Sequence, residues 1–101
     1  MKMIIKGKKY DTETAEFLGG DSHLWPNDLD FWKEELYRKK TGEFFLYGEG
    51  GAGSKYGKEV STNSWSGSET IIPLTEDRAR NWAENHLSVE KYEEIFGEVE
   101  E

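Results

Sequence analysis

The sequence predicts an α+β domain spanning residues 1–101, in which a small antiparallel sheet of about five strands carries helices on one face. Short apolar runs separated by turn residues fill the chain up to residue 74, and two helical repeats follow it. A chain of 101 residues has room for a single hydrophobic core. One short helix near the N-terminus and two C-terminal helices are therefore expected to pack on that one sheet.

An N-terminal hairpin is expected in residues 3–10, because Gly7 tolerates the positive φ of a tight turn. After the hairpin, Asp11 or Thr12 has the side chain of a helix N-cap. The pair at 19–20 consists of two glycines, which commonly end helices. The sequence thus predicts a helix of about two turns between them.

The strongest hairpin signal lies in the middle of the chain. Residues 35–38 and 43–47 are rich in strand-forming side chains, and a Thr-Gly pair at 41–42 supplies the turn. The second run is apolar at successive positions, which indicates a central strand buried on both faces. Residues 21–30 are expected to form a loop whose Trp25 folds back onto the core.

Residues 48–67 are rich in glycine and serine and are predicted to form a long flexible loop. Gly48–Gly53 matches the glycine spacing of dinucleotide-binding loops, but residues 54–58 do not begin a helix that would hold a pyrophosphate. A flexible connection without a cofactor is therefore the interpretation. A last strand is expected at 68–74, with Pro73 placing it at an edge of the sheet.

Two helices are predicted at the C-terminus. Thr75 is the N-cap of the first, which runs to about Leu87, and Ser88 is the N-cap of the second, which ends near Gly97. Their apolar residues recur at helical spacing: Ala79, Trp82, Ala83 and His86, then Val89, Tyr92, Ile95, Phe96 and Val99. Residues 98–101 form a frayed acidic tail.

Candidate catalytic and metal-binding residues are few. The chain has no Cys, Asp28 and Asp30 alone are too few ligands for a cation, and His23 and His86 form no acid–base set with a nucleophile. His86, on an apolar helix face, is interpreted as a core histidine. The sequence therefore predicts a protein that binds a partner without catalysis and without a metal or cofactor.

The negative charge is concentrated in the second half of the chain. Residues 59–101 hold eleven acidic side chains against Arg78, Arg80 and Lys91, which accounts for the whole net charge of −8. Such a segment repels nucleic acid and is steered toward basic surfaces. The candidate partner-binding residues are Tyr56, Trp65, Glu76, Asp77, Glu84, Glu90, Glu93 and Glu94. Alternatively, the acidity only keeps the protein in solution.

The two aromatic candidates differ from the carboxylates in how they would contribute to binding. Trp and Tyr are enriched in binding hot spots, so Trp65, with Tyr56 nearby, is expected to anchor a partner beside the acidic helices. The N-terminal residues Met1–Lys6 contain too few apolar side chains for a signal peptide or a membrane span, so the cytoplasm is the expected location.

Several stretches carry a resemblance: Ile5–Ala15, Phe44–Tyr56, Ile71–Thr75 and Trp82–Glu84. Together they resemble small acidic proteins of Firmicutes phages and mobile elements, a pool that includes anti-CRISPR inhibitors. The resemblance implies an inhibitor that mimics DNA and occupies the nucleic-acid site of a CRISPR effector nuclease in the host cell. The alternative is a structural or regulatory accessory protein of a mobile element, acting as a monomer or as a homodimer.

Overall fold

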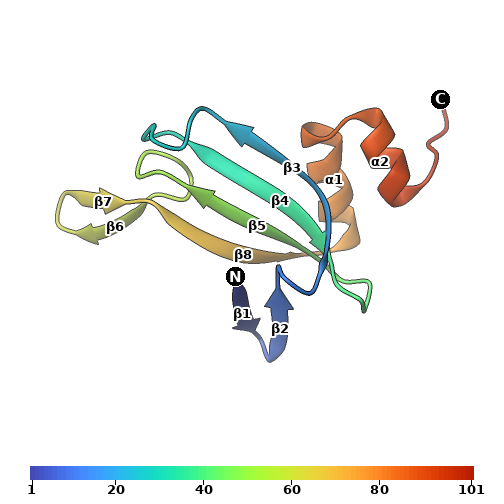
Figure 1. Ribbon diagram of the computed structural model, residues 1–101, viewed down its shortest axis with the longest axis horizontal. Helices are drawn as coiled ribbons and strands as arrows, with labels where there is room; N and C mark the ends of the chain where they lie inside the picture. The colour runs from blue at the N-terminus through green and yellow to red at the C-terminus, as the bar shows by residue number, and fades with distance from the viewer.

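A four-stranded antiparallel sheet forms the centre of the molecule, which the computed structural model describes over residues 1–101 (Figure 1). In spatial order its strands are β3 (Glu16–His23), β4 (Trp32–Arg38), β5 (Phe44–Gly50) and β8 (Ser68–Leu74). Two separate hairpins are formed by β1 (Lys2–Ile5) with β2 (Lys8–Asp11), and by β6 (Lys58–Ser61) with β7 (Ser64–Ser66). The helices α1 (Glu76–His86) and α2 (Val89–Phe96) complete the chain.

The α+β class, the antiparallel sheet and the two C-terminal helices are confirmed, whereas the expected strand number is too low. Eight strands lie in three sheets. The predicted middle hairpin is present as β4 and β5, with Arg38 opposite Phe44 and Gly42 at a φ of 93° in the turn. β5 lies between β4 and β8, and β8 lies at the edge of the sheet, both as expected.

The predicted N-terminal helix is wrong, because residues 16–23 form strand β3. The Asp11 carboxylate accepts a hydrogen bond from the backbone N–H of Glu13 at 2.9 Å, so it stabilises a turn and not a helix. Gly19 does not end a helix, and its importance lies in its lack of a side chain. A Cβ there would lie 2.9 Å from Leu87 Cδ2, so the glycine lets the segment after α1 approach the strand closely.

The two expected loops also differ from the prediction. Trp25 is 76% exposed, so its ring does not fold back onto the core. Within residues 48–67, β5 continues to Gly50, a turn of residues 51–57 follows, and β6 and β7 form a hairpin. The turn is held by backbone hydrogen bonds, because Gly51 donates to Phe31 and Gly53 donates to Leu29, each at 2.8 Å.

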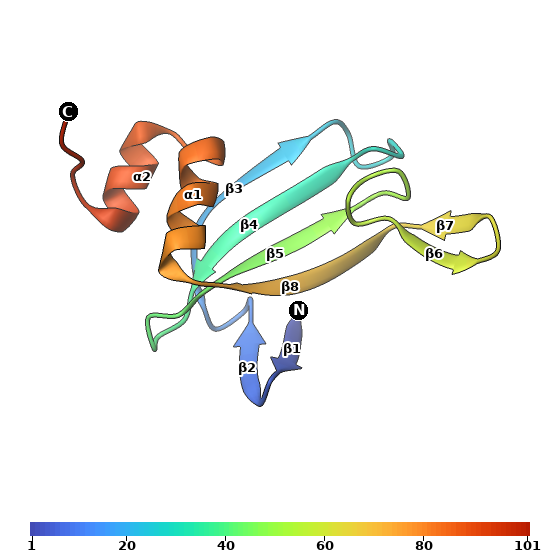
Figure 2. The same ribbon diagram turned by 180° about the vertical axis from the view of Figure 1, so that it is seen from behind.

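The sheet buries apolar side chains on both faces. Alternation along the strands sends Leu36 and Phe44 toward α1 and sends Tyr37 and Phe45 to the opposite face. On the first face they meet Trp82 and the other buried residues of α1; on the second face they lie under the β1–β2 hairpin (Figures 1 and 2). This division explains why the sequence of β5 is apolar at consecutive positions.

Both C-terminal helices begin and end where the sequence predicts. The Thr75 hydroxyl accepts a hydrogen bond from the N–H of Arg78, and the Ser88 hydroxyl accepts one from the N–H of Lys91, each at 3.2 Å. Gly97 ends α2 with a φ of 94°. No helix of the structure has the length and the apolar composition needed to cross a membrane.

Candidate partner-binding surface

Helices α1 and α2 with residues 97–101 form what we call the acidic end of the molecule. It carries nine acidic side chains and three basic ones, so it holds −6 of the net charge of −8. Figure 1 places it at one end of the sheet, and the β6–β7 hairpin projects from the other end. The structure therefore gathers most of the excess charge on one part of an elongated surface.

The carboxylates of the acidic end differ in how far they are neutralised. Glu76 accepts a hydrogen bond from Arg80 Nε at 3.0 Å, and Glu94 lies 3.6 Å from Lys91 Nζ. Asp77, Glu84 and Glu90 are exposed and form no ion pair. None of these three carboxylates takes part in a salt bridge within the protein, so their charge is available to a partner. Exposed carboxylates of this kind can pair with Lys or Arg at little desolvation cost.

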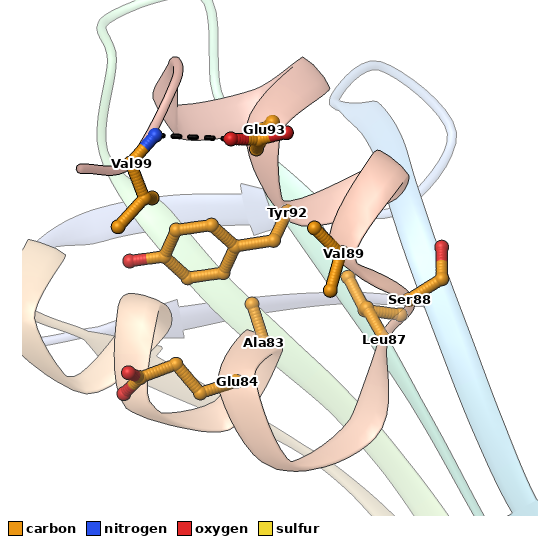
Figure 3. Close-up of a pocket in the computed structure, with 8 residues that line it drawn as sticks. All are labelled: Ala83, Glu84, Leu87, Ser88, Val89, Tyr92, Glu93 and Val99. Atoms are coloured by element: carbon orange, nitrogen blue, oxygen red, sulfur yellow. Dashed lines mark hydrogen bonds between the residues drawn. The ribbon is translucent and has the colours of Figure 1, made fainter. Parts of the chain in front are cut away.

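A groove of about 340 Å³ lies between α1 and α2 (Figure 3). It is lined by Ala83, Glu84, Leu87, Ser88, Val89, Tyr92, Glu93 and Val99. In Figure 3 the ring of Tyr92 extends between the two helices, with Glu84 on the α1 side and Glu93 on the α2 side. The groove thus combines an apolar floor with a carboxylate on each helix.

The groove exists because α2 packs less closely than its sequence predicts. Phe96 contacts Phe44 of the sheet with ring centroids 5.6 Å apart, but α2 has no fully buried residue. Val89 and Val99, expected on the packed face, are 71% and 58% exposed. Because Gly97 redirects the chain after only eight helical residues, Val99 returns to the groove, where its N–H donates to the Glu93 carboxylate at 3.0 Å.

The two aromatic candidates do not lie beside these carboxylates. Tyr56 is only 7% exposed, and its hydroxyl donates to the buried carboxylate of Glu34, so its side chain is part of the interior. Trp65 is exposed, but it lies on β7, at the end of the molecule opposite the helices (Figure 1). The structure therefore separates the expected anchors from the acidic helices, since the hairpin that carries Trp65 extends away from the sheet.

A buried carboxylate that the sequence analysis missed lies at the centre of the helix-covered face. Glu34 is 1% exposed and accepts hydrogen bonds from Trp82 Nε1 at 2.9 Å and from the Tyr56 hydroxyl. Lys55 Nζ lies 2.7 Å from the same carboxylate. The available signal was strand alternation, which puts Glu34 on the same face as Leu36.

The three donors decide the charge of Glu34. Burial acts to raise the pKa of this carboxyl, but the hydrogen bonds from Lys55, Trp82 and Tyr56 together outweigh it, so the pKa lies below its ordinary value. Burial and the Glu34 carboxylate raise the pKa of the Tyr56 hydroxyl. Glu34 is therefore a charged group with its acceptor sites occupied, and it connects β4, the turn of residues 51–57 and α1.

The histidines lie beside this cluster. His86 Nδ1 is 2.8 Å from Asp21 Oδ2, and its ring stacks on Trp82 with centroids 4.7 Å apart. His23 stacks on Trp32 at 6.0 Å, and Trp32 in turn meets His86 edge-on. His86 is thus a half-buried residue with a carboxylate partner on the apolar face of α1, in keeping with its interpretation as a core histidine.

The remaining motifs have structural roles in the loops. Asp28 Oδ2 accepts a hydrogen bond from the N–H of Trp25 at 3.0 Å, which stabilises the β3–β4 turn. The glycine-rich turn leads into strand β6, where a nucleotide-binding loop would lead into a helix. No three His, Asp or Glu side chains are grouped so as to hold a metal ion.

A second exposed surface lies at the end opposite the helices. Its large apolar side chains are Trp25 and Leu29 from the β3–β4 loop and Val60 and Trp65 from the β6–β7 hairpin. Every residue of the hairpin strands is exposed, so the hairpin packs little against the sheet.

In comparisons with protein-family models, with curated proteins and with solved structures, nothing matched this chain.

Proposed function

We propose that this protein is a non-catalytic inhibitor that binds a basic, nucleic-acid-handling protein through its acidic end. The observation that carries the proposal is the concentration of −6 of the net charge on the acidic end, that is, on two consecutive helices and residues 97–101, with Asp77, Glu84 and Glu90 free of ion pairs. Carboxylates spaced along helices can pair with the Arg and Lys side chains that otherwise hold phosphates. Binding would then exclude nucleic acid by occupancy.

The partner class follows from the resemblance to proteins of phages and mobile elements, which favours a CRISPR effector nuclease in the host cytoplasm. The mechanism needs no turnover and no direct contact with nucleic acid. Long-range attraction speeds the encounter of oppositely charged surfaces and weakens as salt screens it. Capture that decreases with salt and competes with DNA is therefore the expected signature.

The test is a pull-down of purified CRISPR effector nucleases at low and high salt, with and without DNA. Glu84→Lys combined with Glu90→Lys should abolish capture, because it reverses two unpaired charges of the acidic end. The matched control is Glu13→Lys combined with Glu59→Lys, which makes the same change of net charge on exposed residues outside the acidic end. Absence of salt-sensitive capture, or equal loss in both variants, would contradict the proposal.

A further inference from the structure

We infer that the groove between α1 and α2 holds an arginine side chain of the partner. This inference rests on the proposed function and adds the chemistry of one ligand group to it. The groove has about 340 Å³ of space, which admits a single long side chain but not a folded segment. Its occupant must match both an apolar floor and two carboxylates.

The floor fits the aliphatic part of a long cationic side chain. Leu87, Val89 and Val99 line the groove, and the two valines are largely exposed without a partner. Arg and Lys bury their methylene groups along such apolar surfaces while the charged group stays at the water interface. A purely apolar occupant would partly desolvate the charged carboxylates of Glu84 and Glu93 without supplying a cation to either.

The aromatic ring in the groove favours Arg over Lys. The ring of Tyr92 extends between the helices, with a carboxylate on either side (Figure 3). A guanidinium group is planar, stacks on aromatic faces and presents several N–H donors at once. An ammonium group has one compact charge and cannot stack on the ring, so a lysine would interact less favourably with the ring and the two carboxylates.

Elsewhere in the protein, two arginines already combine contact with an aromatic ring and pairing with a carboxylate. The guanidinium of Arg80 lies 4.8 Å from the ring centroid of Phe96 and donates from Nε to Glu76 at 3.0 Å. Arg38 likewise lies over Phe44 and pairs with Glu16. Since Arg80 is engaged by Glu76, the carboxylate of Glu84 is left for a cation from outside the chain.

Neighbouring apolar residues fix the orientation of Tyr92. Its ring lies 5.0 Å from that of Phe96, centroid to centroid, and it packs against the buried cluster that contains Ala83. These contacts hold the ring across the groove before any partner arrives. Because the ring is already positioned, an arriving guanidinium would meet a prepared surface and lose less free energy to ordering.

The experiment is a titration of the ¹⁵N-labelled protein with the capped tripeptide Gly-Arg-Gly, followed by amide chemical shifts. Matched peptides carry lysine or citrulline, the uncharged isostere of arginine, in the central position. We expect saturable shifts confined to residues 83–99, weaker binding of the lysine peptide, and about tenfold weaker binding of the citrulline peptide, since two exposed charge pairs are lost.

Variants of the protein test the same contacts. Glu84→Gln and Glu93→Gln should each weaken binding of the arginine peptide about two- to fivefold, whereas Glu59→Gln, at an exposed carboxylate of β6 outside the acidic end, should leave binding unchanged. Equal binding of the citrulline peptide, shifts outside the groove, or no saturation at millimolar peptide would overturn the inference. If the peptide titration fails but the protein still captures its partner in a salt-sensitive manner, only the inference about the groove is wrong. If both the peptide titration and the capture fail, the proposed function is wrong as well.

Discussion

The indole N–H of Trp82 donates a hydrogen bond of 2.9 Å to the carboxylate of Glu34, a residue 48 positions earlier in the chain. Tyr56 and Lys55 approach the same carboxylate from the turn of residues 51–57. One buried charge therefore connects the sheet, the helix that begins the acidic end and the glycine-rich turn. No buried side-chain N or O atom in the structure lacks a hydrogen-bond partner, so this network is complete.

Removing the charge of Glu34 is expected to destabilise the fold. Glu34→Gln turns a carboxylate with three donors into an amide that accepts through one oxygen only, which should lower the free energy of unfolding by about 1–3 kcal/mol. Urea denaturation followed by tryptophan fluorescence measures the change. Lys55→Met is the matched comparison, and because Lys55 is more than half exposed it should cost less. A smaller effect for Glu34→Gln than for Lys55→Met would contradict this account.

Stability should fall in acid partly through Glu43. Hydrogen bonds from Lys8 and Thr41 lower the pKa of Glu43 from 4.5 to about 2. A lowered folded-state pKa means that the unfolded chain binds the proton more readily, so the stabilisation exists above pH 4.5 and is lost as the pH falls toward 2. Thermal unfolding between these pH values should show a shallower decline for Glu43→Gln. Parallel curves for the two proteins would exclude this role.

Substitution of two of the tryptophans should affect the free energy of unfolding to very different extents. Trp65 is 57% exposed on the projecting hairpin, so Trp65→Ser should change the free energy of unfolding by less than about 0.5 kcal/mol. Trp82 is buried against the sheet and donates to Glu34, so Trp82→Ala should cost about 3–5 kcal/mol. Chemical denaturation of both variants, followed by circular dichroism, measures the difference. Comparable losses would mean that the hairpin packs on the body of the protein.

The start of α1 depends on one hydroxyl. Thr75→Ala removes the acceptor for the N–H of Arg78 and should lower the free energy of unfolding by about 0.5–2 kcal/mol. Thr75→Ser keeps a hydroxyl at the same position and should retain most of the stability. The comparison is made by thermal and urea denaturation. If the alanine and serine variants are equally stable, the cap does not contribute as described.

The elements whose signals are local could be predicted from the amino-acid sequence. Thr75, Ser88 and Gly97 set the helix limits, and Gly42 set the turn of the middle hairpin, because capping and positive φ depend on a few neighbouring residues. The concentration of negative charge near the C-terminus is also evident from the amino-acid sequence. That charge became one surface only because the two helices lie at the same end of the sheet (Figure 2).

The other features depend on contacts between residues far apart in the chain, which have no local signal in the sequence. Phe17 and its neighbours have local signals compatible with a helix, yet pairing with β4 and the approach of Leu87 to Gly19 favour a strand. Tyr56 is buried because Gly48 leaves room for its ring and Glu34 accepts its hydroxyl. Such long-range packing and hydrogen bonding override local propensity, and they alone place each side chain inside the protein or on its surface.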